Sequence, residues 1–129
     1  MGLVIVSHSA PLAAGLAELV AQVAGADVPI EVVGGGPGGT LGTDGERVLE
    51  ALRRAAHGSG AVVLMDLGSS VLAVKAALAE LADDERGRLR VADAPLVEGA
   101  IAAGVTASTG DDANGVLRAA EEARHVGKL

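Results

Sequence analysis

Apolar residues follow two patterns that alternate along the chain. Short runs rich in valine, leucine and isoleucine are typical of buried strands, and longer stretches with apolar residues every three or four positions are typical of amphipathic helices. The short runs predict strands near 2–7, 29–33, 61–65 and 88–91. The longer stretches predict helices near 10–24, 44–57, 70–82 and 96–108, and one that is capped by Asp111 or Asp112 and ends near Arg124.

This alternation predicts an α/β fold with an open, mainly parallel sheet of about four strands and with helices on both faces of the sheet. Because crossovers between parallel strands are right-handed, we expect the strand order 2-1-3-4. The chain has 129 residues, half of them apolar, which is the usual size of one domain with its own core. We therefore expect residues 1–129 to form a single domain.

Side-chain spacing adds detail to the predicted helices. Two helices are expected to turn these apolar residues toward the core: Leu12, Leu16, Leu19, Val20 and Val23 in the first, and Val71, Leu72, Val74, Leu78 and Leu81 in the third. Thr43 is placed to cap the second helix, because Glu46 follows three residues later, as in a capping box.

Composition excludes several classes of protein. The chain has no Phe, Tyr or Trp to stack on bases, and its formal charge of -7 repels phosphate backbones and anionic membranes. It has no cysteine, which excludes disulfide scaffolds, zinc ribbons and thiol catalysis. The apolar run at the amino terminus is too short for a signal peptide or a membrane span. We expect a cytoplasmic protein that binds neither nucleic acid nor membrane.

A histidine and an aspartate follow two of the predicted strands. His8 comes after the first strand and Asp66 after the third. In the order 2-1-3-4 these two strands are neighbours, and the switch point of the topology falls between them. Ligands of open α/β sheets bind at the carboxyl ends of the strands next to such a point. We therefore expect His8 and Asp66 to face one crevice.

This pair predicts a particular chemistry. A carboxylate that accepts a hydrogen bond from one ring nitrogen fixes the tautomer of the histidine and leaves the lone pair of the other nitrogen free to attack. The segment after Asp66 continues as Gly68-Ser69-Ser70 and begins a helix, whose free N–H groups suit a phosphate. Phosphoryl transfer needs this combination of nucleophile, positioning and hydrogen-bond donors.

Four segments, in this order, carry a family resemblance: Val4-Ile5-Val6-Ser7-His8-Ser9, Gly42-Thr43-Asp44, Met65-Asp66-Leu67-Gly68-Ser69 and Ala94-Pro95-Leu96-Val97-Glu98-Gly99. Over nearly its whole length the chain resembles the phosphotransferase subunits of dihydroxyacetone kinases. These subunits belong with the mannose-type enzyme IIA domains of the sugar phosphotransferase system (PTS). The resemblance implies one mannose-type enzyme IIA-like domain over residues 1–129.

The resemblance also implies a function. His8 is expected to accept a phosphoryl group from the phosphocarrier protein HPr and to pass it to ADP held in the nucleotide-binding subunit of the kinase, after which a third subunit phosphorylates dihydroxyacetone. Related chains are homodimers, and some carry further phosphocarrier domains. Because this sequence ends after the first domain, we expect its phosphoryl donor to be a separate protein.

The site residues of the family map onto this sequence one by one. The phosphorylated histidine maps to His8, its carboxylate partner to Asp66, and the phosphate-binding residues to Gly68, Ser69, Ser70 and Thr43. The chain departs from the family pattern at 34–39, which is unusually rich in glycine.

Several structural alternatives remain open for these residues. His8 can simply end a strand, and Asp66, Ser69 and Ser70 can cap the helix that follows. His57 is expected to lie at the end of a helix, where a positive charge interacts favourably with the helix dipole. His125 is expected to lie in the tail, and Glu98 is expected to be a buried hydrogen-bonding group or a subunit contact.

Other functional classes fit the sequence less well. The chain has no G-x-S-x-G nucleophile elbow, and strand alternation is expected to turn Ser7 and Ser9 away from His8. It has no Walker loop, its glycine run is interrupted by Pro37, and we expect neither a cofactor nor a metal. The alternatives to a carrier are a regulatory PTS IIA-like module whose phosphorylation state a partner reads, and a small hydrolase or metal-dependent enzyme.

Overall fold

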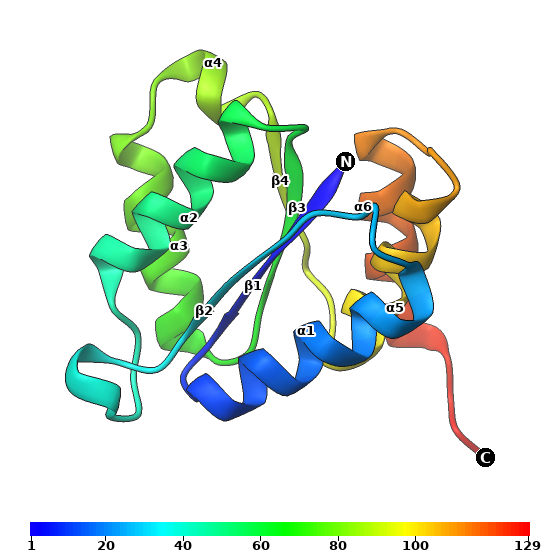
Figure 1. Ribbon diagram of the computed structural model, residues 1–129, viewed down its shortest axis with the longest axis horizontal. Helices are drawn as coiled ribbons and strands as arrows, with labels where there is room; N and C mark the ends of the chain where they lie inside the picture. Colours follow the sequence, from blue (N-terminus) through cyan, green and yellow to red (C-terminus); the bar gives the residue numbers. More distant parts are fainter.

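The computed structural model describes all residues from 1 to 129, and apart from a short helix at Asp83–Arg86, which the sequence did not predict, its strands and helices alternate as expected (Figure 1). The strands are β1 (Gly2–Ser7), β2 (Ile30–Gly34), β3 (Ala61–Met65) and β4 (Leu89–Val91). The helices are α1 (Ala10–Ala24), α2 (Gly45–His57), α3 (Gly68–Glu80), α4 (Asp83–Arg86), α5 (Leu96–Ser108) and α6 (Ala113–Glu122). Two short 3₁₀ turns, η1 (Pro37–Gly39) and η2 (Ala123–His125), complete the chain.

The four strands form one parallel sheet in the order β2-β1-β3-β4, which confirms the predicted topology. β1 lies between β2 and β3, with Val6 opposite both Val33 and Met65. The first crossover leads from β1 to β2 on one side of it, and the second passes back across β1 to β3 on its other side. The switch point therefore lies between the carboxyl ends of β1 and β3.

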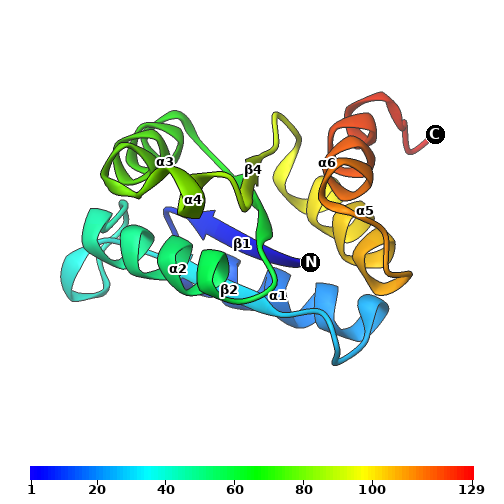
Figure 2. The same ribbon diagram turned by 90° about the horizontal axis from the view of Figure 1, so that it is seen from above.

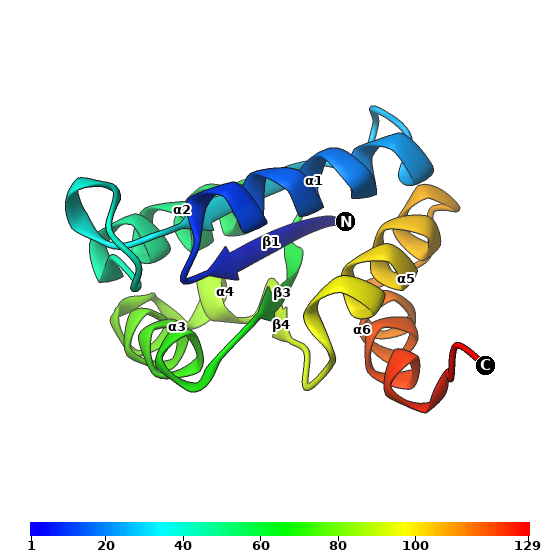
Figure 3. The same ribbon diagram turned by 90° about the horizontal axis from the view of Figure 1, so that it is seen from below.

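Helices cover both faces of the sheet, as predicted. Figures 2 and 3 show α2 and α3 on one side of β1 and α5 and α6 on the other, with α1 lying along the sheet on the side of α5. Because β1 and β3 are buried on both faces, they are continuous apolar runs rather than alternating ones.

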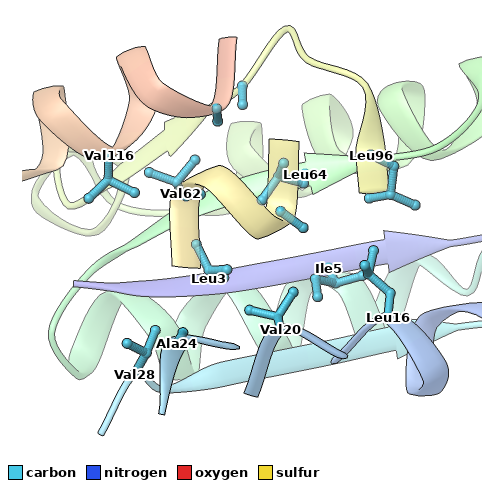
Figure 4. Packing of buried hydrophobic residues seen from close by; sticks show 14 of the residues in the cluster. Leu3, Ile5, Leu16, Val20, Ala24, Val28, Val62, Leu64, Leu96 and Val116 are labelled. Carbon is cyan, nitrogen blue, oxygen red and sulfur yellow. The ribbon is translucent and has the colours of Figure 1, made fainter. Parts of the chain in front are cut away.

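Alternate residues of the central strands enter two separate cores. Leu3 and Ile5 of β1 pack with Leu64 of β3 against α1, α5 and α6, as Figure 4 shows. Val4 and Val6 pack with α2 and α3 on the opposite face. Valine, leucine and alanine fill both cores without any aromatic side chain.

The predicted apolar face of α1 is wrong in part. Leu16 and Val20 are buried, but the helix turns Ala13 and Ala24 inward, and Leu12, Leu19 and Val23 are about half exposed. Small residues let α1 approach the sheet and α5 closely, and a Cβ on Gly104 of α5 would come within 2.6 Å of Val20 Cγ1. In α3, Val74 is buried as predicted, whereas Leu72 faces outward.

The cap of α2 also differs from the prediction. Asp44, not Thr43, is the N-cap residue, and its carboxylate accepts hydrogen bonds from the N–H groups of Glu46 and Arg47. Asp and Thr are both good caps, so the sequence alone does not separate two adjacent candidates. The side chain of Thr43 is instead turned toward α3.

No helix has the length and apolar content needed to cross a membrane.

Candidate active site

The carboxyl ends of β1 and β3 bring His8 and Asp66 together, as the topology predicts. The N–H of Asp66 donates to the carbonyl of Val6, which extends the pairing of the two strands by one residue. His8 is likewise held through its main chain, because the N–H of Gly42 donates to its carbonyl over 3.0 Å. At the lower left of Figure 1, the end of β1 meets the beginnings of α1 and α3.

The two residues share two hydrogen bonds. The Nδ1 atom of His8 lies 2.8 Å from Oδ1 of Asp66, and the main-chain N–H of His8 donates to Oδ2 over 3.0 Å. The side chains of His8 and Asp66 are 20% and 13% exposed, so the pair is largely buried but still reaches solvent. One carboxylate thus holds both the backbone and the ring of the same histidine.

Three further donors reach the same carboxylate. Ser70 Oγ and the N–H of Leu67 donate to Oδ1 over 2.8 and 2.7 Å, and Ser7 Oγ donates to Oδ2 over 2.8 Å. Burial raises the pKa of the Asp66 carboxyl, but the hydrogen bonds from His8, Ser7 and Leu67 outweigh it and hold the pKa well below its usual range. Asp66 is therefore ionised at neutral pH.

The charge on Asp66 determines the tautomer of His8. An ionised carboxylate can only accept hydrogen bonds, so the proton of the neutral imidazole lies on Nδ1. The lone pair of Nε2 then points away from Asp66, and Ser69 Oγ donates to it from the first turn of α3. The nitrogen that can react is the one nearer to solvent.

Ser70 and Thr43 support this arrangement from behind. Ser70 is fully buried, and its Oγ lies 3.1 Å from Nδ1 of His8 as well as 2.8 Å from Asp66. Thr43 Oγ1 lies 3.3 Å from Ser70 Oγ. Because the proton of Ser70 points to Asp66, Thr43 is the donor of this last bond. The loop before α2 is thereby linked to the histidine.

The beginning of α3 faces the exposed side of the pair. The first hydrogen bonds of the helix run from the N–H groups of Ser70 and Val71 to the carbonyl of Leu67, so the N–H groups of Gly68 and Ser69 lie ahead of them at the open end. Such a helix end offers donors and partial positive charge to an anion. Nε2 of His8, Gly68 and Ser69 are thus grouped at one place.

The structure decides between several of the alternatives. Leu67 is the N-cap residue of α3 and has no side-chain cap, so neither Asp66, Ser69 nor Ser70 caps the helix. At the start of α3, Asp66 accepts only the N–H of Leu67, and the Ser70 hydroxyl donates to Asp66. These side chains form hydrogen bonds with His8 or with each other, and they do not cap the helix.

Sequence reasoning missed Ser7. Strand alternation predicts that Ser7 points away from His8, and that argument considers the histidine alone. Asp66 extends beyond the end of the sheet, where its second oxygen is within reach of Ser7. A polar residue at the last position of an otherwise apolar buried strand was the available signal.

The other candidate residues lie away from this site. His57 Nε2 is 2.8 Å from Glu85 Oε2, at the end of α2 as expected. Glu98 is not the buried group that one interpretation predicts, since its side chain is 42% exposed and pairs with Lys128 Nζ over 2.7 Å, and its role as a subunit contact stays a prediction. The residues 34–39 continue from β2, where the N–H of Gly35 donates to the carbonyl of Ser7. No group of three or more His, Asp or Glu side chains is placed to hold a metal ion.

Comparison with known proteins gives concordant results. The family model EIIA-man, described as PTS system fructose IIA component, matches residues 2–117. A solved crystal structure of a protein of unknown function, EF1359, superposes with a TM-score of 0.83 at 33% identity and covers 94% of each chain.

Two curated relatives are named as phosphoryl donor subunits DhaM of PEP-dependent dihydroxyacetone kinases. The protein of Escherichia coli K12 is 38% identical over 120 residues, which are 91% of this chain and 25% of that protein. The protein of Listeria innocua is 30% identical and is covered over 94% of its length, with 92% of this chain. This chain therefore spans about a quarter of the first relative and nearly all of the second.

The family model covers most of the chain, including every residue of the His8–Asp66 site, and the Listeria relative and the solved structure are each matched over 94% of their length. The chain belongs to the EIIA-man family of PTS components.

Proposed function

We propose that this chain is a phosphohistidine carrier, the phosphotransferase subunit of a dihydroxyacetone kinase, built as one mannose-type enzyme IIA-like domain. His8 accepts a phosphoryl group from HPr and passes it to ADP bound in the nucleotide-binding subunit of the kinase. The names of the relatives support the choice of kinase. The observation that carries the proposal is the geometry of His8, whose Nδ1 is held by an ionised carboxylate while Nε2 lies on the exposed side of the ring.

Nε2 is the proposed acceptor atom. Its lone pair attacks the phosphorus of the phosphohistidine of HPr, and the bond between that phosphorus and the donor nitrogen breaks, returning its electron pair to the donor ring. The proton on Nδ1 stays in its bond to Asp66, which stabilises the positive charge that develops on the ring. In the second step an oxygen of ADP attacks the phosphorus, and the electron pair of the broken bond returns to Nε2.

The four proposed phosphate-binding residues divide into two pairs. We assign the contacts with the phosphoryl oxygens to Gly68 and Ser69, which lie at the open end of α3 beside Nε2. Ser70 and Thr43 stand behind the ring, where their hydroxyl groups are directed to Asp66 and to one another. Their part is to hold the histidine and its carboxylate in place.

A homodimer is also part of the proposal. The outward face of α1 carries Leu12, Leu19 and Val23, each about half exposed. Large apolar side chains grouped on one exposed helix face are typical of an interaction surface. A second copy of this chain covers it in the proposed assembly. Light scattering of the protein and of Leu19→Glu tests this point, and a wild-type protein that stays monomeric at high concentration contradicts it.

The kinase function is tested by reconstitution. Phosphoenolpyruvate, enzyme I, HPr, this chain and the two other kinase subunits are combined with ADP and dihydroxyacetone, and dihydroxyacetone phosphate is measured. We expect product with the wild-type chain and none with His8→Ala. A chain that becomes phosphorylated, yields no product and still binds another protein favours the regulatory IIA-like module instead. Hydrolysis of a substrate by the chain alone favours the hydrolase.

A further inference from the structure

We propose that Ser7 is a positioning residue, whose hydroxyl holds the Asp66 carboxylate in the orientation that keeps the proton of His8 on Nδ1. The proposal rests on the proposed function of His8. Ser7 and Ser70 are the two buried polar residues of the chain. A hydroxyl is buried at a cost unless it is hydrogen-bonded, so its partners indicate what it is there to hold.

The direction of the hydrogen bonds at Ser7 is settled by its two neighbours. The N–H of Ser9 donates to Ser7 Oγ over 3.1 Å, and Ser7 Oγ lies 2.8 Å from Oδ2 of Asp66. Because the first bond uses a lone pair of Ser7, the hydroxyl proton is free to point at the carboxylate. Hydrogen bonds that run in one direction strengthen one another, so the main chain at the start of α1 makes Ser7 a better donor.

The two oxygens of Asp66 are thereby given different tasks. Oδ2 is held by the hydroxyl of Ser7, the last residue of β1, and by the main-chain N–H of His8, which follows the strand. Oδ1 is left for the ring of His8, together with Ser70 and Leu67. Without Ser7, Oδ2 keeps a single donor, and the carboxylate is freer to turn about its Cβ–Cγ bond. We expect Oδ1 to lose its alignment with Nδ1 and the Nδ1–H tautomer to become less dominant.

The test compares Ser7→Ala with Ser9→Ala. Ser9 is the matched control, since its hydroxyl caps α1 by accepting from the N–H of Leu12 and does not touch Asp66. Nitrogen-15 NMR of the free protein measures the two tautomers of His8, and rapid mixing with phosphorylated HPr measures the rate of phosphoryl acceptance. We expect Ser7→Ala to shift the tautomers toward Nε2–H and to slow acceptance by about 10-fold or more, as for the loss of one hydrogen bond to a charged group. Ser9→Ala should change neither readout.

The outcomes separate this proposal from the proposed function. A tautomer ratio or a rate in Ser7→Ala equal to that of the wild type overturns the role of Ser7, and so does an equal change in both variants. A wild-type chain that accepts no phosphoryl group overturns the proposed function, while the NMR comparison still tests Ser7. If Ser7→Ala does not fold, Ser7→Cys, which has a similar shape but a weak S–H donor, takes its place with the same expected direction.

Discussion

Asp66 binds His8 twice, through the main-chain N–H at Oδ2 and through Nδ1 of the ring at Oδ1, although the two residues are 58 positions apart. Both bonds exist because β1 and β3 are neighbours that end at the same edge of the sheet. Because its main chain and one ring nitrogen are both hydrogen-bonded, the histidine side chain has little freedom to rotate, and its other ring nitrogen keeps one orientation. The topology therefore positions Nε2, the proposed acceptor atom, before any partner binds.

Replacing Asp66 with alanine should slow phosphoryl transfer without preventing it. The ring keeps Nε2 but loses the group that fixes its tautomer and stabilises its charge, and such losses reduce rates by about 10-fold to 1000-fold. Rapid mixing with phosphorylated HPr measures the rate. Asp44→Ala is the control, because it removes the cap carboxylate of α2 instead. Equal rates in Asp66→Ala and the wild type would leave the carboxylate without a role in transfer.

The depressed pKa of Asp66 predicts a pH dependence of stability. The folded-state pKa lies below the unfolded value of about 3.9, so the stabilisation is fully present above about pH 4 and is lost as the pH falls through the folded-state pKa. Asp66→Asn should therefore lose less stability than the wild type between pH 5 and the acid transition. Urea unfolding across this range measures both proteins. Parallel curves would show that Asp66 has the same pKa in both states.

The exposed side chain of Leu67, which adjoins the His8–Asp66 pair, should contribute to the docking of HPr. Leu67 follows Asp66 directly, and its side chain is 63% exposed. We expect Leu67→Ser to raise the KM for phosphorylated HPr about 5-fold, the effect of a contact worth about 1 kcal/mol, with kcat nearly unchanged. Val126→Ser, which changes an exposed residue of the C-terminal tail, is the control. An unchanged KM in Leu67→Ser would place the docking surface elsewhere.

Gly34 should be intolerant of a side chain. A Cβ there would lie 2.6 Å from Ala10 Cα and 2.9 Å from the carbonyl of Ser9, both main-chain atoms at the start of α1. Gly34→Ala should lower the free energy of unfolding by about 1–3 kcal/mol. Gly15→Ala, in the middle of α1 with open space around it, should raise that free energy by about 0.5–1 kcal/mol. Denaturant unfolding checks both signs, and a neutral Gly34→Ala would mean that α1 moves easily.

The fold was largely predictable, because the two central strands are continuous apolar runs, the two edge strands are mainly apolar, and each major helix repeats its apolar residues every three or four positions. The strand order followed from handedness alone, and with it the meeting of His8 and Asp66. Exposure was less predictable. The periods of α1 and α3 identify apolar residues, but packing against small neighbours such as Gly104 decides which of them are buried.

The hydrogen bonds of the site were the least predictable part. Thr43 and Ser7 belong to it for reasons of geometry, since Thr43 reaches Ser70 across 27 positions and Ser7 reaches Asp66 across 59. From local sequence patterns, Thr43 is predicted to be a helix cap and Ser7 is predicted to point away from His8. Capping and strand alternation concern only the helix or strand to which a residue belongs. Contacts between elements depend on where each loop ends in space.

The central claim is that His8 carries the phosphoryl group, and intact-mass spectrometry tests it most directly. The wild-type chain and His8→Ala are each incubated with phosphoenolpyruvate, enzyme I and HPr, with the phosphorylation of HPr as the positive control. We expect one phosphoryl group on the wild type and none on His8→Ala, stable to base and lost in acid. The same gain of mass in both proteins, or none in the wild type while HPr is phosphorylated, would contradict the account.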